Sequence, residues 1–436
     1  MLKITKFGGS SVANAEQFKK IKNIIQQDPT RRYIVVSAPG KRFSADNKIT
    51  DLLYLLDAHR KYHVDASSVF KLIKNRFIEI KNELGLKQPI EKELDAFYTN
   101  LNQMSQAVIV SRGEYFCAKL MAEYLGYAFV DAKDIIRFKL DKSIDWDATS
   151  AKLQAKYAQY DHFVFPGFYG TSANGHIQVF PRGGGDITGA ILAKCLHADV
   201  YENWTDVSGF LMADPTIVQN PKGITHITYS ELRELSYMGA SVLHEEAIFP
   251  VKEANIPIHI LNTNRPQDAG TIIQEHSKIK SGYPITGKKD FMSIYIYKKH
   301  MSNEVGFIRK ALSILEKYHI SIEHIPSGID SFNIVVEKKE IEESLYEILA
   351  HFKEELKPDK LTIQDDLALI STVGKNMSDK PGTSGKLFGA LGKNNINIVM
   401  IAQGSDEINI TVGVKKKDFT KTVQVIYDTF VGGNEE

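Results

Sequence analysis

The sequence contains very little cysteine. Cys117 and Cys195 are the only two in 436 residues, and each lies in an apolar, helix-like stretch. Two scattered cysteines supply neither a disulfide framework nor a thiolate metal cage. We therefore expect a protein of a reducing compartment, the cytoplasm.

Long apolar runs and an excess of one charge are also missing. No run approaches the ~20 apolar residues of a membrane-spanning helix, and the N-terminus lacks the apolar core of a signal peptide. The 54 Lys and Arg residues nearly balance the 53 Asp and Glu residues, which leaves a formal net charge of +1. Nucleic acid and anionic membranes attract proteins with an excess of positive charge. We expect neither kind of partner, and neither export nor membrane anchoring.

Several phosphate-binding and catalytic motifs are absent as well. No Gly-Lys pair is followed by Ser or Thr, which excludes a P-loop. The glycines of PRGGGDITGA miss the G-x-G-x-x-G spacing by one residue, so a dinucleotide fingerprint is not supported. The sequence also contains no H-E-x-x-H, no paired-cysteine zinc motif and no protein-kinase H-R-D and D-F-G pair.

The first part of the chain has the pattern of an α/β domain. Up to about Ile273, short β-rich runs alternate with helical patterns, which predicts a sheet covered by helices on both faces. Asn174-Gly175 is typical of an antiparallel hairpin, so we expect a mainly parallel sheet with an antiparallel edge. The expected strands are LKITKF, YIVVSA, YAFVDA, HFVFPG, HIQVF, VYENWTD and PIHIL. The expected helices are FKKIKNIIQQ, the region 51–84, EYFCAKLMAEYLG and ITGAILAKCLHA.

An internal repeat follows a polar, Gly- and Pro-containing stretch, EHSKIKSGYPITGKKD. The segment from Gly306 overlays without gaps on the segment from Gly382, and each copy has a glycine turn, an amphipathic helix and two alternating strands. Any helix followed by a hairpin has a similar pattern, but a gap-free register is hard to obtain by accident. We predict a first domain at 1–276 and two α+β units at 290–364 and 365–436, with exchange of strands between the two units allowed.

Two glycine-rich junctions are candidates for binding an anion. In KITKFGGSS, Gly8 and Gly9 follow a strand and precede a helix, where free N–H groups and the helix dipole favour an anion, and Lys6 adds a positive charge. The alternative is a tight turn with a solvated lysine. Three residues could cap the following helix: Ser10, Ser11 and Asn14.

The second junction, PRGGGDITGA, repeats this arrangement after the strand HIQVF. Arg182 could hold a carboxylate at two points, Asp186 could balance charge near phosphates, and Thr188 lies near the helix start. A local ion pair between Arg182 and Asp186 would explain the same residues.

Other polar residues allow two interpretations each. Glu114 in SRGEYF is expected at the start of a helix, where it either favours the dipole or binds a substrate ammonium group. Thr50 either caps a helix or donates its hydroxyl to a substrate. In WTDVSGFLMADP, Asp206 and Asp214 fit turn chemistry as well as nucleotide contacts.

Taken in order, six motifs and the doubled unit after them resemble the aspartate kinases of the amino-acid kinase superfamily. The motifs are KFGGSSVA, SAPG…KITDLL, SRGEY, PRGGGD, WTDVSG and MADP. The resemblance covers essentially the whole chain and implies the amino-acid kinase fold, followed by two ACT domains, which are βαββαβ modules that bind amino-acid effectors. Because the chain stops at Glu436, we expect no homoserine dehydrogenase extension.

The activity implied by this resemblance is transfer of the ATP γ-phosphoryl group to the β-carboxylate of L-aspartate, the first step towards lysine, threonine and methionine. A carboxylate nucleophile is already ionised at neutral pH, so no general base is required. Mg²⁺ would arrive with ATP, held mainly by phosphate oxygens and water, without a metal site of the protein's own.

The resemblance also implies roles for individual residues. Lys6 matches the transition-state cation, and Asp186 matches the catalytic aspartate that orients it. Arg182 matches the partner of the substrate α-carboxylate, and Glu114 matches the partner of its ammonium group. The remaining substrate-side positions are Ser37, Thr50, Gly183 and Gly184. The expected nucleotide-binding positions are Lys6, Gly8, Gly9, Ser10, Thr205, Asp206, Phe210 and Asp214.

The nucleotide side departs from the family pattern. Thr216 and Ser241 occupy positions where Arg and Lys are usual, and Phe210 replaces a frequent tyrosine. Losing two cations should weaken phosphate binding unless other charges take over. The candidates are Lys222, Arg233 and Lys252.

Regulation by lysine or threonine is expected where two ACT modules meet, in a homodimer or higher homo-oligomer. The candidate effector residues are Met301, Gly306, Ser321 and Glu323. Two rival functions remain open: a superfamily kinase for glutamate, carbamate or a nucleoside monophosphate, and a catalytically silent amino-acid sensor.

Overall fold

The computed structural model describes residues 1–181, 183–239, 243, 245–277, 279, 282–375, 377, 380–404 and 408–432. Its contacts divide the chain into two compact units. The first comprises Met1–Phe210, Gly223–Tyr229 and Val242–Lys280, and the second comprises Leu211–Lys222, Ser230–Ser241 and Ser281–Glu436. The predicted domain boundaries at 276, 290 and 365 stay predictions.

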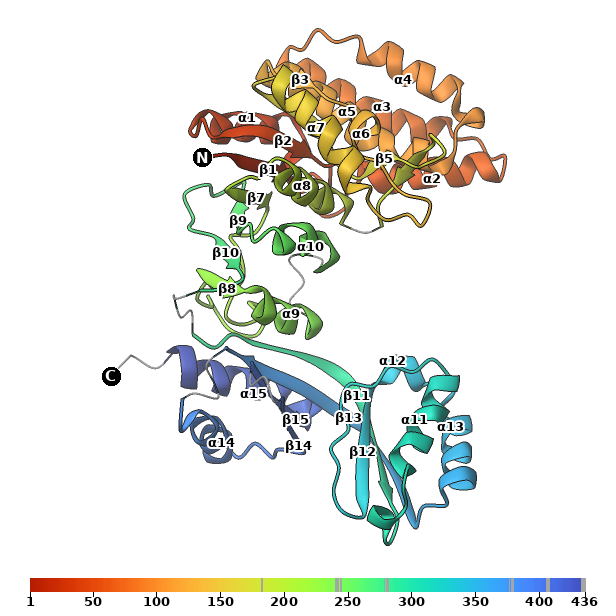
Figure 1. Cartoon of the computed structure of the whole chain (residues 1–436), viewed down its shortest axis with the longest axis vertical. Coiled ribbons are helices and arrows are strands. Elements are labelled where there is room, and N and C mark those ends of the chain that lie inside the picture. The colour runs from red at the N-terminus through yellow and green to blue at the C-terminus, as the bar shows by residue number, and fades with distance from the viewer. Residues whose placement is uncertain are drawn as a thin grey trace. The chain divides into compact units, whose positions relative to one another are not determined.

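A mainly parallel sheet forms the centre of the first unit (Figure 1), in the order β3-β4-β2-β1-β7-β9-β10-β8. Its strands are β1 (Lys3–Phe7), β2 (Arg31–Val36), β3 (Ala128–Phe129), β4 (Phe163–Pro166), β7 (Val200–Thr205), β8 (His226–Thr228), β9 (Ile258–Asn262) and β10 (Thr271–Gln274). Among the described pairings of this sheet, only β9 with β10 is antiparallel. The mainly parallel sheet is therefore confirmed, and its antiparallel pairing lies near one edge.

Two details of the predicted sheet were wrong. The Asn174-Gly175 hairpin exists, but it joins β5 (Tyr169–Thr171) to β6 (Ile177–Val179) in a separate two-stranded sheet. The last two strands in this order, β10 and β8, were not predicted, because four- and three-residue strands show too little alternation to be distinguished from loops.

Helices cover both faces of the sheet. Those of the first unit are α1 (Ala15–Gln26), α2 (Ile49–Lys61), α3 (Ser67–Leu84), α4 (Ile90–Thr99), α5 (Gln106–Leu125), α6 (Ala132–Ile135), α7 (Trp146–Gln159), α8 (Gly184–Cys195) and α10 (Glu245–Glu253), with short 3₁₀ turns η1 (Ser10–Val12) and η2 (Leu101–Gln103). Helix α5 packs on β2, β3 and β4, whereas α8 packs on β1, β2 and β7 and against α7 and α10.

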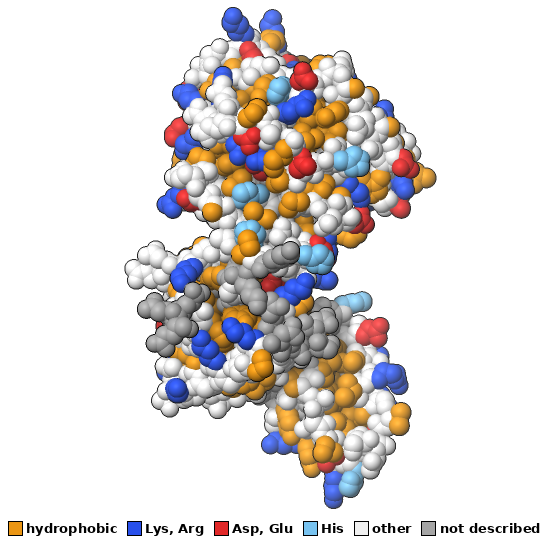
Figure 2. Space-filling view, turned by 60° about the vertical axis from the view of Figure 1, so that its left-hand side comes forward, with side chains coloured by type: hydrophobic (Ala, Val, Ile, Leu, Met, Phe, Trp, Pro, Cys, Tyr) orange, Lys and Arg blue, Asp and Glu red, His pale blue; other side chains and the backbone are white. Residues whose placement is uncertain are grey.

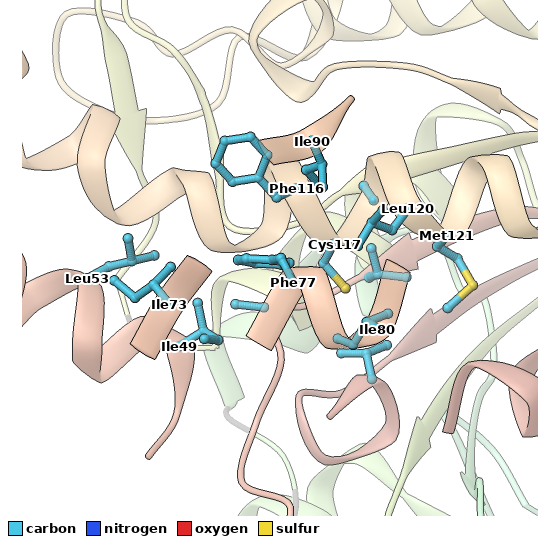
Figure 3. Packing of buried hydrophobic residues seen from close by; sticks show 14 of the residues in the cluster. Ile49, Leu53, Ile73, Phe77, Ile80, Ile90, Phe116, Cys117, Leu120 and Met121 are labelled. Atoms are coloured by element: carbon cyan, nitrogen blue, oxygen red, sulfur yellow. The ribbon is translucent and has the colours of Figure 1, made fainter. Parts of the chain in front are cut away.

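Strand alternation distributes the side chains of β1 between these two faces. Phe7 belongs to the apolar cluster built on α1, α2, α3 and α5, while the neighbouring Lys6 points to the face that α8 covers. Figure 3 shows part of this cluster, in which Phe77 of α3 lies among Ile73, Phe116 and Cys117. The cluster makes α2, α3 and α5 a rigid support for the loops that end at them.

The second unit contains a five-stranded antiparallel sheet in the order β12-β11-β13-β15-β14. Its strands are β11 (Ile285–Tyr297), β12 (Ser331–Glu337), β13 (Lys360–Val373), β14 (Met400–Gln403) and β15 (Asn409–Lys415). Its helices are α9 (Tyr229–Tyr237), α11 (Phe307–Lys317), α12 (Lys338–Ile341), α13 (Leu345–His351), α14 (Thr383–Lys393) and α15 (Phe419–Tyr427). Short turns at Met301–Asn303 and Lys416–Asp418 and π-helical turns at Phe352–Leu356 and Asp428–Gly432 complete it.

The predicted repeat is visible in this unit. Gly306 and Gly382 precede α11 and α14 with φ values of 80° and 91°, a left-handed conformation that suits glycine. β11 pairs with β13 along nearly its whole length, so both repeats use segments of these two strands.

The repeats differ in one strand. In the second copy the residues after the helix form β14, whereas the matching residues of the first copy make only isolated bridges from His324 and Ser327. Both Glu323 and His324 donate to the carbonyl of Val335, and Pro326 has no N–H to continue a ladder.

Acidic and basic side chains are interspersed over the part of the first unit visible in Figure 2, as expected from the balanced charge. Within the ranges given above, every helix is too short or too polar to cross a membrane. Both cysteines are buried and free.

Candidate active site

The first glycine junction lies at the carboxyl end of β1. Gly8 donates its N–H to Trp204 O (2.9 Å), and the chain then turns through η1, which contains Ser10. Asn14 caps α1 by accepting the N–H of Gln17 at 3.0 Å, so Asn14, rather than Ser10 or Ser11, is the helix cap. A Cβ added to Gly8 would lie 3.5 Å from the Lys6 Nζ.

The second glycine junction precedes α8. Gly183 takes a left-handed conformation with φ 78°, and the helix begins at Gly184. A Cβ on Gly184 would come within 2.7 Å of the Phe168 ring, so this position has room only for glycine. Arg182, predicted to bind the substrate α-carboxylate, lies outside the described residues.

The structure brings the two junctions together at Lys6 and Asp186. The Lys6 Nζ is 2.5 Å from the Asp186 Oδ1, and the Lys6 residue is only 7% exposed. Because Asp186 lies in the first turn of α8, its backbone position is set by the helix, while β1 holds Lys6 in the sheet. The two residues expected to act together are therefore adjacent, and their catalytic roles stay predictions.

Asn203 is a residue of this site that sequence reasoning missed. It pairs with Lys6 in the register of β1 and β7, accepts a hydrogen bond from the Lys6 Nζ (3.4 Å) and donates one to the Asp186 Oδ1 (2.9 Å). Tyr201, on the same strand, donates its hydroxyl to the Asp186 carbonyl at 3.1 Å. A buried polar residue in the middle of the strand VYENWTD was the available signal, because interior strand positions are normally apolar.

Ser37 lies close to this pair, and Thr50 lies in the first turn of α2. Ser37 follows β2 and donates its N–H to Phe7 O at 3.1 Å, and a Cβ on Gly185 would lie 2.8 Å from its Oγ. Thr50 is partly buried in the first turn of α2, which begins at Ile49 after Lys48, so the interpretation of Thr50 as a helix cap was wrong.

Glu114 lies in the interior of α5, where the expectation of a helix start was wrong. The helix begins at Gln106, because Ser105 caps it by accepting the N–H of Val108. The Glu114 carboxylate accepts a hydrogen bond from the Ala38 N–H, but its Oε2 has no hydrogen-bond partner among the residues that the structure describes. Burial raises the pKa of Glu114 to about 8. A buried carboxyl with a free oxygen is ready to receive a cationic group.

The predicted nucleotide side begins at the carboxyl end of β7. Thr205 donates its hydroxyl to the Asp206 Oδ1 at 3.1 Å, and the Ser11 and Thr263 hydroxyls meet at 2.8 Å, which joins η1 to the end of β9. Phe210 is buried, with its N–H bonded to the Thr271 Oγ1 at 2.8 Å.

The remaining residues considered for the nucleotide side are divided between the two units, and their roles stay predictions. Asp214 belongs to the second unit, where it accepts the N–H and the hydroxyl of Thr216 at 2.8 and 2.7 Å. Lys222 and Arg233 are in the second unit and Lys252 is in the first, whereas Ser241 lies outside the described residues. Replacement of the missing cations by one of these three stays a prediction.

The candidate effector residues all lie in the second unit. Met301 is buried, Gly306 precedes α11, and the Ser321 N–H donates to the Glu340 Oε2 at 3.3 Å. The Glu323 carboxylate accepts a hydrogen bond from the Tyr237 hydroxyl, and burial raises the pKa of Glu323.

Comparisons with known proteins identify the family of this chain. The sequence profile of the amino acid kinase family matches residues 1–262, and a profile of the ACT domain matches residues 370–430. Aspartokinase 3 of Bacillus subtilis is 38% identical over 452 aligned residues, which cover 99% of both chains.

Solved structures give the same assignment. The aspartate kinase of Clostridium acetobutylicum superposes with a TM-score of 0.92 at 47% identity, covering 98% of this chain and 99% of that one. Aspartokinase III of Escherichia coli, solved in complex with aspartate and ADP, shares the fold with a TM-score of 0.73 at 23% identity, covering 98% and 99% of the two chains. The chain therefore belongs to the amino acid kinase family, as an aspartokinase that carries an ACT domain.

Proposed function

We propose that this aspartokinase transfers the γ-phosphoryl group of ATP to the β-carboxylate of L-aspartate, giving 4-phospho-L-aspartate and ADP. The observation that carries the proposal is the Lys6–Asp186 contact of 2.5 Å, formed where two glycine junctions meet at the end of the sheet. The similarity to aspartokinases over the whole chain supports the choice of aspartate as acceptor.

In this proposal Lys6 stabilises the charge on the transferring phosphoryl group. Asp186 and Asn203 hold its ammonium in place, so little reorganisation is needed when charge develops on the phosphoryl oxygens. The aspartate β-carboxylate attacks as the ionised nucleophile, and the protein contributes alignment and charge neutralisation rather than a base. Gly8, Gly9 and Ser10 leave space and N–H groups for the phosphates.

Mg²⁺ would supply charge neutralisation on the β- and γ-phosphates when bound with ATP. This ion prefers oxygen ligands and retains water, and no group of three or more metal-ligating side chains occurs in the described part of the chain. Asp206, at the end of β7, has an exposed carboxylate that could bind a water of the ion.

On the acceptor side, we assign Glu114 to the ammonium group of aspartate. Its unpaired Oε2 can accept a hydrogen bond from the ammonium group, and the Ala38 N–H that donates to the same carboxylate favours its ionised form. Ser37 and Thr50 offer hydroxyl groups, and Arg182 is assigned to the α-carboxylate by its place in the PRGGGD motif.

An assay of ADP release coupled to hydroxylamine trapping tests the reaction. We expect ADP release to depend on aspartate and to match the amount of aspartyl hydroxamate formed, because hydroxylamine captures an acyl phosphate. Glutamate should support much slower release. ADP release that is independent of aspartate, or that yields no hydroxamate, would contradict the proposal.

We further propose feedback control by lysine or threonine through the repeats of the second unit, in a homodimer or higher homo-oligomer. The support is the ACT match at residues 370–430 and the presence of Ser321 and Glu323 after α11 of the first repeat. A ligand that binds the folded state raises the melting temperature. In a thermal-shift series with lysine, threonine and methionine, we expect one of the first two to raise Tm and lower activity. No response to any of the three would argue against control by these amino acids.

A further inference from the structure

We propose that Arg76 is a positioning residue that holds the nucleotide-side turn and the substrate-side loop of the active site in register. The inference rests on the function proposed above, and it concerns a side chain outside every motif considered so far. Arg76 lies in the middle of α3, where its neighbours Ile73, Phe77 and Ile80 belong to the apolar cluster. At 4% exposure it is a buried guanidinium within a helix that otherwise buries apolar side chains.

The guanidinium of Arg76 contacts two segments that are far apart in the sequence. Its Nη1 donates to the carbonyls of Gly40 (2.8 Å) and Ala13 (3.4 Å). Its Nη2 donates to the Asp46 Oδ2 at 2.6 Å and to the Asn47 carbonyl at 3.4 Å. Ala13 directly follows η1, while Gly40, Asp46 and Asn47 belong to the loop between β2 and α2.

The first of these segments is the turn that we assign to the phosphates. Gly40 donates its N–H to Gly9 O at 2.8 Å, so the loop rests directly on the glycine junction. A Cβ on Gly40 would come within 2.6 to 2.8 Å of backbone atoms of Gly9 and Ser10, so the two backbones pack as closely as glycine permits. A shift of Gly40 therefore displaces the turn.

The second segment carries the groups assigned to aspartate. The loop between β2 and α2 begins at Ser37, continues through Ala38, whose N–H donates to the Glu114 carboxylate, and ends before Thr50. The Ile49 N–H donates to Pro39 O at 3.0 Å, which closes the loop on itself. By binding both ends of this loop, Arg76 couples its position to that of the phosphate turn.

The chemistry of the contact favours arginine. Asp46 is buried and also accepts hydrogen bonds from the Arg42 N–H (2.9 Å) and Nε (2.8 Å). A planar fork can reach a carbonyl on one side and a carboxylate on the other at the same time, which a single ammonium cannot do with the same geometry. Arg76→Lys should therefore keep the ion pair with Asp46 and lose the simultaneous hold on Gly40.

The test compares Arg76→Met and Arg76→Lys with a matched control, Arg31→Met. Arg31 is also a largely buried guanidinium that joins a carboxylate, Glu202 (2.8 Å), to a backbone carbonyl, Ile24 O (2.7 Å), but it lies at the amino end of β2. For each full-length variant we measure steady-state kinetics for ATP and aspartate, the melting temperature, and hydrogen exchange of the peptide spanning 37–50.

Both Arg76 variants should raise the KM for ATP and for aspartate and lower kcat/KM by roughly a hundredfold, since a displacement of about 1 Å costs this much. Exchange of the 37–50 peptide should become faster. Arg31→Met should lower the melting temperature comparably, with KM values within about twofold of the wild type.

The proposal is overturned if a folded Arg76 variant has both KM values within about twofold of those of Arg31→Met, or if exchange of the 37–50 peptide is unchanged. Where Arg76→Met does not fold, Arg76→Lys and Asp46→Asn are judged by the same criteria. If the wild type itself shows no aspartate-dependent ADP release, the proposed function fails, while the exchange measurement still decides the role of Arg76.

Discussion

Lys6→Met should lower kcat by roughly a thousandfold, about 4 kcal/mol of transition-state stabilisation. The Lys6 ammonium lies where the two glycine junctions meet, 2.5 Å from the Asp186 Oδ1. Methionine has a similar length and no charge, so the site keeps its shape and loses the cation. Steady-state kinetics with saturating ATP and aspartate measure the effect, and calorimetric titration with ATP separates lost binding from lost turnover.

Lys3→Met is the matched control for this variant. Lys3 lies on the same strand, and its Nζ forms ion pairs with Asp28 (2.9 Å) and Glu202 (3.0 Å) at the opposite end of the sheet. It should cost stability and leave kcat within about twofold. If a folded Lys6→Met variant retains more than about a tenth of the wild-type kcat, the assignment of Lys6 as the transition-state cation is wrong.

Glu114→Gln should raise the KM for aspartate about 10- to 100-fold, because a hydrogen bond between charged groups contributes about 1.5–3 kcal/mol. The pKa of about 8 adds a pH dependence: near neutral pH the empty site holds mostly the neutral acid, and binding of an ammonium group requires the carboxylate. The wild-type KM for aspartate should therefore fall as pH rises from about 6.5 to 8.5, and binding should release a proton. In Glu114→Gln this dependence should disappear.

The titration of Glu114 should also change the stability of the ligand-free protein with pH, in a direction that follows from the raised pKa. The folded-state pKa of Glu114 is raised above its ordinary value of 4.5, so the folded protein binds more protons than the unfolded chain between pH 4.5 and about 8. The contribution of Glu114 to the free energy of unfolding therefore decreases as pH rises through this window, by up to roughly 5 kcal/mol. Glu114→Gln should remove this decrease and be more stable than the wild type near pH 8 without aspartate.

Neighbouring groups should not obscure this titration. Tyr54, Cys117 and Tyr169 surround Glu114, and burial raises the pKa of each, so all three stay neutral near neutral pH. Glu123→Gln is the control on the same helix, where the carboxylate accepts the N–H groups of Lys87 and Gln88. A Glu123→Gln variant that abolished the pH dependence, or a Glu114→Gln variant that kept it, would refute the assignment.

Much of the site could be predicted because its residues lie in short local patterns. Lys6 lies near the end of a strand that is followed by two glycines, and Asp186 lies in the first turn of the helix that begins at the second glycine run. The second junction follows β6, which belongs to the separate two-stranded sheet, so the main sheet does not place the two junctions side by side. The packing of α8 on β1 and β7 brings Asp186 to Lys6 instead. Their contact depends on a strand order, β2-β1-β7, in which β1 is central.

Other features of the site could not be predicted from short stretches of the sequence. Glu114 was expected at a helix start, but α5 begins at Gln106. Gly113 lets this helix approach Ala38, because a Cβ at position 113 would lie 2.7 Å from the alanine side chain. Asn203 and Arg76 are isolated polar residues in apolar segments. Asn203 contacts a residue 197 positions away in the sequence, and Arg76 contacts one 63 positions away. No local sequence pattern can therefore indicate these contacts.

The sequence by itself determined the order of the elements, the two glycine junctions, the doubled unit at the C-terminal end and the likeness to the aspartate kinases. These follow from side-chain periodicity and turn chemistry, which act over a few neighbouring residues. Only the tertiary structure decided which polar side chains are buried together. Packing between distant segments excludes water, and this packing buries Glu114 and raises its pKa. The same packing creates the contacts of Asn203 and Arg76.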